Sequence, residues 1–227
     1  LTKTDKIEQT YTEQQNYWGG YDPNIFNISD NTDLFGYYQS YWYYQKHEDI
    51  IIKELTPNTL LITKNQEILN KIKEKYSGYE IVSLHLRRGD SDLSMYGNGY
   101  QALDVNSRWN LYFLDAKKHF ENKKVKFLIF TGGKKTADNG SDDDYVWCKN
   151  NFKSDEFVFF DYDRNVMNDF TLMYLCDHHI LSPSTTLSWW VGFLNKKNNK
   201  IIVAPRKYAD LKRAVPDGFY PNNFILI

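Results

Sequence analysis

The chain has little cysteine: its 227 residues include only Cys148 and Cys176. Two cysteines cannot build the disulfide framework of a small secreted domain, and neither stands at metal-ligand spacing from a pair of histidines. This usage fits a reducing compartment. We therefore expect a cytoplasmic protein, with peripheral association at the inner membrane face as the alternative.

Long apolar runs and an excess of one charge are also missing. No run approaches the roughly 20 apolar residues that span a bilayer, and no signal-type segment is present. The 28 basic and 29 acidic residues leave a net charge of -1. Because no bulk field draws the chain to polyanions, we expect no nucleic-acid partner and no membrane span, and a small molecule as ligand.

Metal-ligand patterns are absent as well. His178 and His179 are adjacent, so within a regular element their side chains point in different directions, and no acidic or cysteine partner stands at ligand spacing. We expect no metal site and expect one of these histidines to be a hydrogen-bonded core residue.

Short apolar runs alternate with segments of helical period along most of the chain. Strands are expected at residues 81–86, 125–130, 157–160, 180–182 and 201–204. Helices are expected at 48–55, around 68–76, after a cap at Asn106-Ser107, and at 145–152, 166–176 and 186–194. This alternation implies βαβ crossovers and predicts an α/β fold with a Rossmann-like parallel sheet. The polar residues 1–33 are expected to run over a surface.

Aromatic residues make up 17% of the chain, and many gather in residues 35–44. Such a patch suits either an aromatic face packed on a core or a platform for a sugar ring. Packing is the favoured interpretation.

The most informative stretch is residues 85–90, here called the arginine segment, which follows an apolar strand directly. Ligands of open α/β sheets bind just outside the carboxyl ends of strands. Arg87 and Arg88 repel each other and need an anion, and a diphosphate fits their forked donors. One alternative is a surface salt-bridge cluster. Another is an adhesion tripeptide at 88–90, which is disfavoured because it adjoins a core strand.

A second cluster, residues 182–188, lies where a strand passes into a helix and is here called the hydroxyl segment. A helix start offers unpaired N–H groups to phosphate oxygens, and neighbouring hydroxyls add donors. The alternative is plain N-capping by Thr185 or Thr186. Trp189 and Trp190 fall inside the helix and are expected in the core.

Together these motifs resemble the alpha-1,2-fucosyltransferase family, inverting enzymes that transfer L-fucose from GDP-fucose to a galactoside. Residues 85–90 are similar to the family's H-x-R-R-G-D signature. Residues 127–131, with Asp143, Asp144, Trp147 and Cys148, resemble its strand, acidic pair and W-C segment. Residues 169–190 resemble its donor-site motif, and residues 21–23 and 36–40 extend the similarity.

The resemblance implies a GT-B fold of two facing Rossmann-like domains. Residues 1–76 would be the remainder of the N-terminal, acceptor-side domain, and residues 77–227 the domain that binds the GDP-sugar. The family's glycine-rich opening does not precede Tyr21, so the N-terminal domain is expected to be incomplete.

The resemblance also implies roles for individual residues. Arg87 and Asp90 would be catalytic, with Asp92 a second candidate for the base. The donor would be bound by His85, Arg87, Arg88, Asp143, Asp144, Ser184, Thr185, Thr186 and Ser188. Neither metal nor cofactor is expected beyond GDP-fucose itself, and the acceptor would be a galactose-containing glycan. Two alternatives stay open: a catalytically silent GDP- or glycan-binding module, and a transferase that uses another sugar nucleotide.

Overall fold

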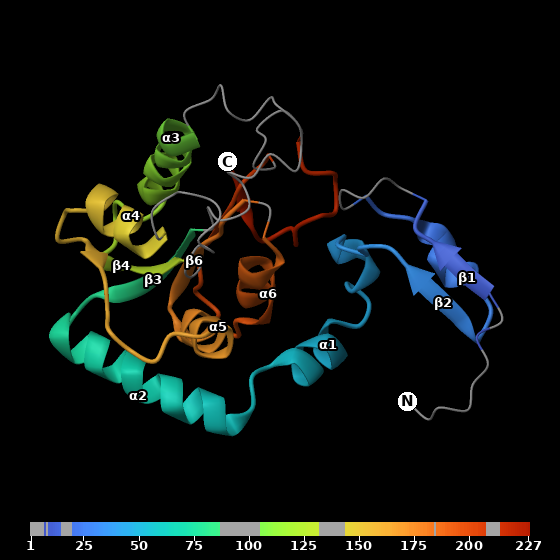
Figure 1. The fold of residues 1–227 in the computed structure, drawn as a ribbon, viewed down its shortest axis with the longest axis horizontal. Helices are drawn as coiled ribbons and strands as arrows, with labels where there is room; N and C mark the ends of the chain where they lie inside the picture. The colour runs from blue at the N-terminus through green and yellow to red at the C-terminus, as the bar shows by residue number, and fades with distance from the viewer. Residues whose placement is uncertain are drawn as a thin grey trace. The chain divides into compact units, whose positions relative to one another are not determined.

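A computed structural model describes residues 7, 9–14, 20–86, 105–131, 144–183, 185–207 and 214–227. The chain divides into two compact units (Figure 1). The smaller consists of Leu1–Glu54 with Ala214–Asn222, and the larger of Leu55–Arg213 with Asn223–Ile227. The predicted division at residue 76 attaches a function to each part and stays a prediction. The compact units divide the chain differently, because helix α2 (Thr59–Lys75) belongs to the larger unit.

The larger unit contains a six-stranded sheet in the order β5-β4-β3-β6-β7-β8, with every neighbouring pair parallel. The strands are β3 (Glu80–Leu86), β4 (Val125–Thr131), β5 (Phe157–Val158), β6 (His178–Ile180), β7 (Ile202–Ala204) and β8 (Ile225–Leu226). The chain adds β4 and β5 on one side of β3, then returns to add β6, β7 and β8 on the other. This is the strand order of a doubly wound sheet, and the predicted α/β class with a parallel sheet is confirmed.

Helices cover both faces of this sheet (Figure 1). They are α2, α3 (Val105–Lys118), α4 (Asp144–Asn151), α5 (Val166–Leu175) and α6 (Thr186–Leu194). On one face Val82 and Leu84 pack with Phe113 of α3 and with Phe120, which follows this helix. On the other, Ile81 and Leu128 pack with side chains of α2 and α5. Because both faces are buried, the central strands are apolar runs without alternation.

Most predicted elements lie within two residues of the observed ones. The helix predicted around 68–76 is the largest correction, because α2 already begins at Thr59. The strand predicted at 180–182 is shifted, because β6 occupies His178–Ile180. The two histidines count as polar in the sequence but are buried in the sheet. Asn106-Ser107 was predicted as a cap and lies inside α3, which begins at Val105.

The smaller unit has strands β1 (Gln9–Thr12) and β2 (Thr32–Phe35), paired in parallel, the short helices η1 (Pro23–Asn27) and η2 (Tyr41–Tyr43), and helix α1 (Glu48–Leu55), which runs to its boundary. The strands expose most of their side chains, as expected for a surface segment, although no strand was predicted there. The buried carboxylate of Asp22 accepts hydrogen bonds from the Tyr11 hydroxyl at 2.6 Å and from the Gln14 and Asn24 amides.

Part of the aromatic segment packs within this unit. Tyr43 is buried, and its ring lies 5.0 Å from Tyr21 and 5.6 Å from Tyr38, centroid to centroid. Its hydroxyl donates to a Glu13 carboxylate oxygen at 2.9 Å. These contacts favour packing, the interpretation preferred from the sequence, although Tyr37 is exposed.

Candidate functional site

The doubly wound order places a switch point between β3 and β6. These strands are parallel neighbours, with Ser83 opposite His179 and Leu84 opposite Ile180. Their carboxyl ends therefore lie side by side at one edge of the sheet. The strand that follows β3 in the chain, β4, lies on one side of this pair, and the strand that follows β6, β7, lies on the other. In open α/β sheets a ligand crevice forms at such a point.

The first predicted cluster begins at the carboxyl end of β3. His85 belongs to the strand and is 5% exposed, on the same face as Ser83. Arg87, Arg88 and Asp90 follow Leu86 in the chain and, with Asp92, lie outside the described residues. The structure therefore locates the strand end from which the arginine segment departs.

The second cluster follows the carboxyl end of β6 and opens helix α6. The amide of Ser182 donates to the Ser188 hydroxyl at 3.2 Å, which closes the turn, and Ser188 is buried. Thr186 is exposed in the first turn of the helix, while Ser184 lies outside the described residues. The turn thus brings the start of α6 beside the end of β3, next to the switch point.

Thr185 occupies the N-cap position of α6, but its side chain makes no capping hydrogen bond. Its Oγ1 atom is buried and has no hydrogen-bond partner in the described part of the chain. Simple capping therefore does not account for this hydroxyl. A buried hydroxyl without a partner costs about 1–3 kcal/mol, a cost that a ligand acceptor at this position removes.

Thr131 belongs to a motif recognised in the sequence, but no functional role was predicted for it. It ends β4, beside Leu86 in the register, and is 5% exposed. Its hydroxyl also lacks a partner among the described residues. In the sequence, Thr131 could have been recognised as a candidate because it places a hydroxyl at the last position of an apolar strand. Of the predicted acidic pair, Asp143 lies outside the described residues, and Asp144 is described only as the first residue of α4.

The two adjacent histidines are structural. The Nδ1 atom of His179 lies 2.8 Å from the Ser83 hydroxyl, and its Nε2 lies 2.8 Å from the side-chain nitrogen of Asn195. Burial lowers the pKa of His179 to about 3, so the ring is neutral, accepts from Asn195 and donates to Ser83. The prediction of a hydrogen-bonded core histidine is confirmed.

His178 points to the opposite face, as its neighbouring position in β6 requires. Its Nδ1 accepts the Ile201 amide at 3.0 Å, and its Nε2 lies 3.4 Å from a Glu80 oxygen. Burial lowers the pKa of His178. Within the described ranges, no three ligand-type side chains gather as a metal site would require.

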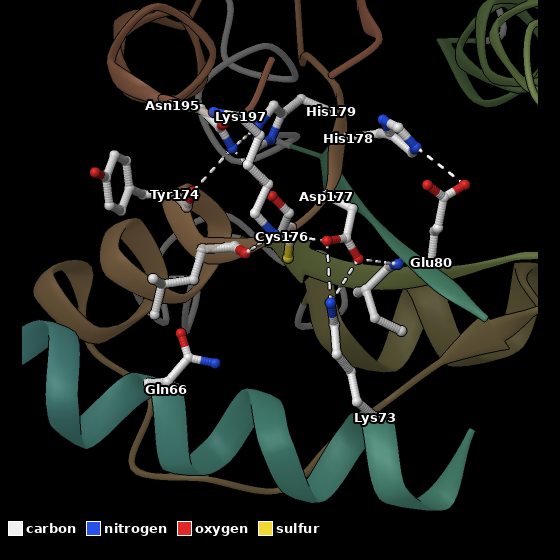
Figure 2. A network of polar contacts seen from close by, with 12 residues as sticks. Gln66, Lys73, Glu80, Tyr174, Cys176, Asp177, His178, His179, Asn195 and Lys197 are labelled. Atoms are coloured by element: carbon white, nitrogen blue, oxygen red, sulfur yellow. Dashed lines mark hydrogen bonds and ion pairs between the residues drawn. The ribbon is translucent and has the colours of Figure 1, made fainter. Parts of the chain in front are cut away.

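A network of polar contacts occupies the opposite, amino edge of β3 and β6 (Figure 2). Asp177 accepts the Ile81 amide at 2.8 Å and pairs with Lys73 at 2.9 Å and Lys197 at 2.6 Å. Burial raises the pKa of Asp177, but these hydrogen bonds outweigh it and lower the pKa to about 2. The network ties α2 to both strands and is distant from the carboxyl edge.

A doubly wound parallel sheet with a switch point between two central strands is typical of α/β proteins that bind nucleotides and related ligands. Residues 3–226 match the model of glycosyl transferase family 11, so the chain belongs to that family, and the resemblance seen in the motifs is confirmed. A similar protein is the O-antigen biosynthesis glycosyltransferase WbnK of Escherichia coli, 22% identical over 218 residues.

That alignment covers 89% of this chain and 63% of the relative. The chain therefore spans less than two thirds of the length of the curated relative. No solved structure matches the chain significantly. Among the described residues, none of the helices combines the length and apolar character needed to cross a bilayer.

Proposed function

We propose that this chain is a glycosyltransferase that moves L-fucose from GDP-fucose to a galactoside hydroxyl, forming an alpha-1,2 linkage with inversion and without a metal. The larger unit would be the GDP-sugar domain of a GT-B arrangement. Family membership supports transfer of a sugar, and the donor and linkage follow from the resemblance in the motifs.

One observation carries the proposal: the arginine and hydroxyl segments leave neighbouring strand ends at the switch point. Adjacent parallel strands lie about 4.8 Å apart, so a single diphosphate can reach both segments. Arg87 and Arg88 would bind its oxygens from one side. The start of α6, with Thr185, would bind them from the other.

The proposed reaction is a single displacement at the anomeric carbon of fucose. The acceptor hydroxyl oxygen forms a bond to this carbon while the bond to the β-phosphate oxygen breaks and GDP leaves with the electron pair. Asp90 or Asp92 takes the hydroxyl proton. Arginine side chains and helix-start amides stabilise the charge that develops on GDP, the task that a divalent cation performs in other transferases.

Calorimetry with GDP in the presence of EDTA tests donor binding. The wild-type chain should bind GDP, and Arg87→Ala should abolish binding. Arg206→Ala is a matched control, because this exposed arginine follows β7 at the same edge of the sheet, two strands from β3. GDP binding that survives Arg87→Ala unchanged would contradict the assignment.

Activity is tested by GDP release from GDP-fucose and lactose, again with EDTA. The proposal expects release, with an α-linked product visible by NMR. Binding of GDP without release identifies the silent binding module instead. Release from another sugar nucleotide in preference to GDP-fucose identifies a transferase of different donor specificity.

A further inference from the structure

Arg164 lies in the connection between β5 and α5 and makes ring contacts on two sides. Its guanidinium carbon is 4.5 Å from the ring centroid of Tyr145 and 5.6 Å from that of Tyr162. The residue is partly buried, and its Nη2 atom is fully buried without a hydrogen-bond partner in the described ranges. A guanidinium held in this way has donors that call for an acceptor.

A nearby carboxylate, that of Asp169, does not supply the acceptor that Arg164 lacks. The Asp169 carboxylate accepts the Tyr162 hydroxyl at 2.5 Å, and the described residues contain no ion pair between it and Arg164. Burial raises the pKa of Asp169, while the Tyr162 hydrogen bond and the charge of Arg164 oppose this rise. Arg164 therefore acts on Asp169 through its charge alone, and its Nη2 atom, which has no partner in the described ranges, stays available to a ligand.

The connection that carries Arg164 is fixed on both sides of it. The Asp163 carbonyl accepts the Asn168 side-chain amide at 2.7 Å, and Asp163 pairs with Lys64 at 3.3 Å. Asn165 caps α5 by accepting the Asn168 amide at 3.0 Å. Because these contacts already hold the backbone, a ligand that binds Arg164 loses little free energy to ordering of this loop.

The position in the sheet points to a nucleobase. Tyr145 is in the first turn of α4 and contacts Phe159, which directly follows β5, with ring centroids 5.6 Å apart. The cluster thus lies at the carboxyl edge, at β4 and β5. Two strand spacings, roughly 10 Å, separate β5 from β3. A ribose and its phosphates cover such a span when the diphosphate is at the switch point.

We propose that Arg164, held against Tyr145 and Tyr162, reads the guanine base of the donor nucleotide. This rests on the proposed function. Guanine presents two acceptors, O6 and N7, in the spacing of a guanidinium fork, whereas adenine presents a donor beside N7. Arg164 is then a specificity-determining residue.

Calorimetry with GDP, ADP and inorganic pyrophosphate tests this inference. Wild type should prefer GDP to ADP on the order of tenfold to a hundredfold. Arg164→Ala and Arg164→Lys should both lose most of this preference and keep the affinity for pyrophosphate, since lysine keeps the charge but not the fork. Lys149→Ala is the matched control, because the Lys149 ammonium lies 4.5 Å from the same Tyr145 ring and should not affect the preference.

The outcomes separate the two proposals. If wild type binds no GDP, the proposed function fails. If wild type binds GDP and both Arg164 variants keep the wild-type preference, the role of Arg164 is wrong while the donor assignment stands. Circular dichroism and thermal melting confirm that each variant is folded. The lysine variant answers the question if the alanine variant does not fold.

Discussion

At the residue scale, Asp177 shows how one carboxylate organises the amino edge of the sheet. It receives a backbone donor from β3 and two ammonium groups, from α2 and from the segment after α6 (Figure 2). Its hydrogen bonds stabilise the ionised form in the folded state, so its folded pKa of about 2 lies below the ordinary value of 3.8. Stability is therefore linked to the ionisation of this residue.

The sign of this linkage gives a pH prediction. The contribution of Asp177, about 2 kcal/mol by linkage, is present above pH 4 and is lost as the pH falls toward 2. Asp177→Asn should lower the free energy of unfolding by about this amount at pH 7 and by little near pH 2.

Urea unfolding followed by tryptophan fluorescence at several pH values measures this difference. Asp161→Asn, at an exposed position of the same unit, is the control and should leave the unfolding free energy nearly unchanged. If the difference in unfolding free energy between wild type and Asp177→Asn stays constant from pH 7 to pH 2, the charge of Asp177 is not the source of its stabilising effect.

Thr185 separates ligand binding from folding. Because its buried hydroxyl makes no capping bond, Thr185→Val removes an unpaired polar atom and keeps the branched shape. The unfolding free energy should be unchanged or higher by up to about 1 kcal/mol. The affinity for GDP should fall about tenfold, as expected when one hydrogen bond to a charged group is lost.

Thermal melting and GDP calorimetry on the same preparation of Thr185→Val give both quantities. Thr185→Ser keeps the hydroxyl and should retain binding. A valine variant that melts at a lower temperature and binds GDP normally would assign the hydroxyl to folding instead.

At the element scale, the sequence predicts whichever elements carry a strong local pattern. The helices at 48–55 and 186–194 were predicted with the observed bounds. Strands β1, β2 and β8 were not predicted, because they are short and lie at edges where hydrogen bonds to distant segments, rather than hydrophobic pattern, decide the structure. The site was predicted to the extent that each cluster follows a strand. That β3 and β6 are neighbours depends on strand order, which no local pattern encodes.

Helix α6 packs closely on the sheet at Gly192. A Cβ atom there would lie 3.2 Å from Ile202 Cγ2 and 3.2 Å from Phe224 Cζ. Gly192→Val should therefore lower the unfolding free energy by about 2 kcal/mol through overpacking.

Gly192→Ala provides a graded control in the same urea titration. Its smaller crowding is offset by a helix propensity about 1 kcal/mol better than that of glycine, so it should be nearly neutral. Equal stability of the valine variant and wild type would mean that α6 and the sheet are less closely packed than described.

At the scale of the whole molecule, the chain combines a six-stranded doubly wound sheet with a smaller unit that is formed by two segments distant in the sequence, Leu1–Glu54 and Ala214–Asn222. Residues 214–222 return to the smaller unit, where the Gly218 carbonyl accepts the Ser40 hydroxyl at 2.8 Å. A Cβ on Gly218 would overlap the Trp42 ring, so the two segments meet closely. Sequence reasoning placed a single boundary because contacts between positions so far apart leave no local signal.

The central claim is that the arginine and hydroxyl segments bind one diphosphate at the switch point. A crystal structure of the chain with GDP tests it most directly. The account predicts diphosphate oxygens within hydrogen-bond distance of both the Arg87 side chain and the first turn of α6. A diphosphate that contacts only one of these segments, or that lies away from the carboxyl ends of β3 and β6, would contradict it.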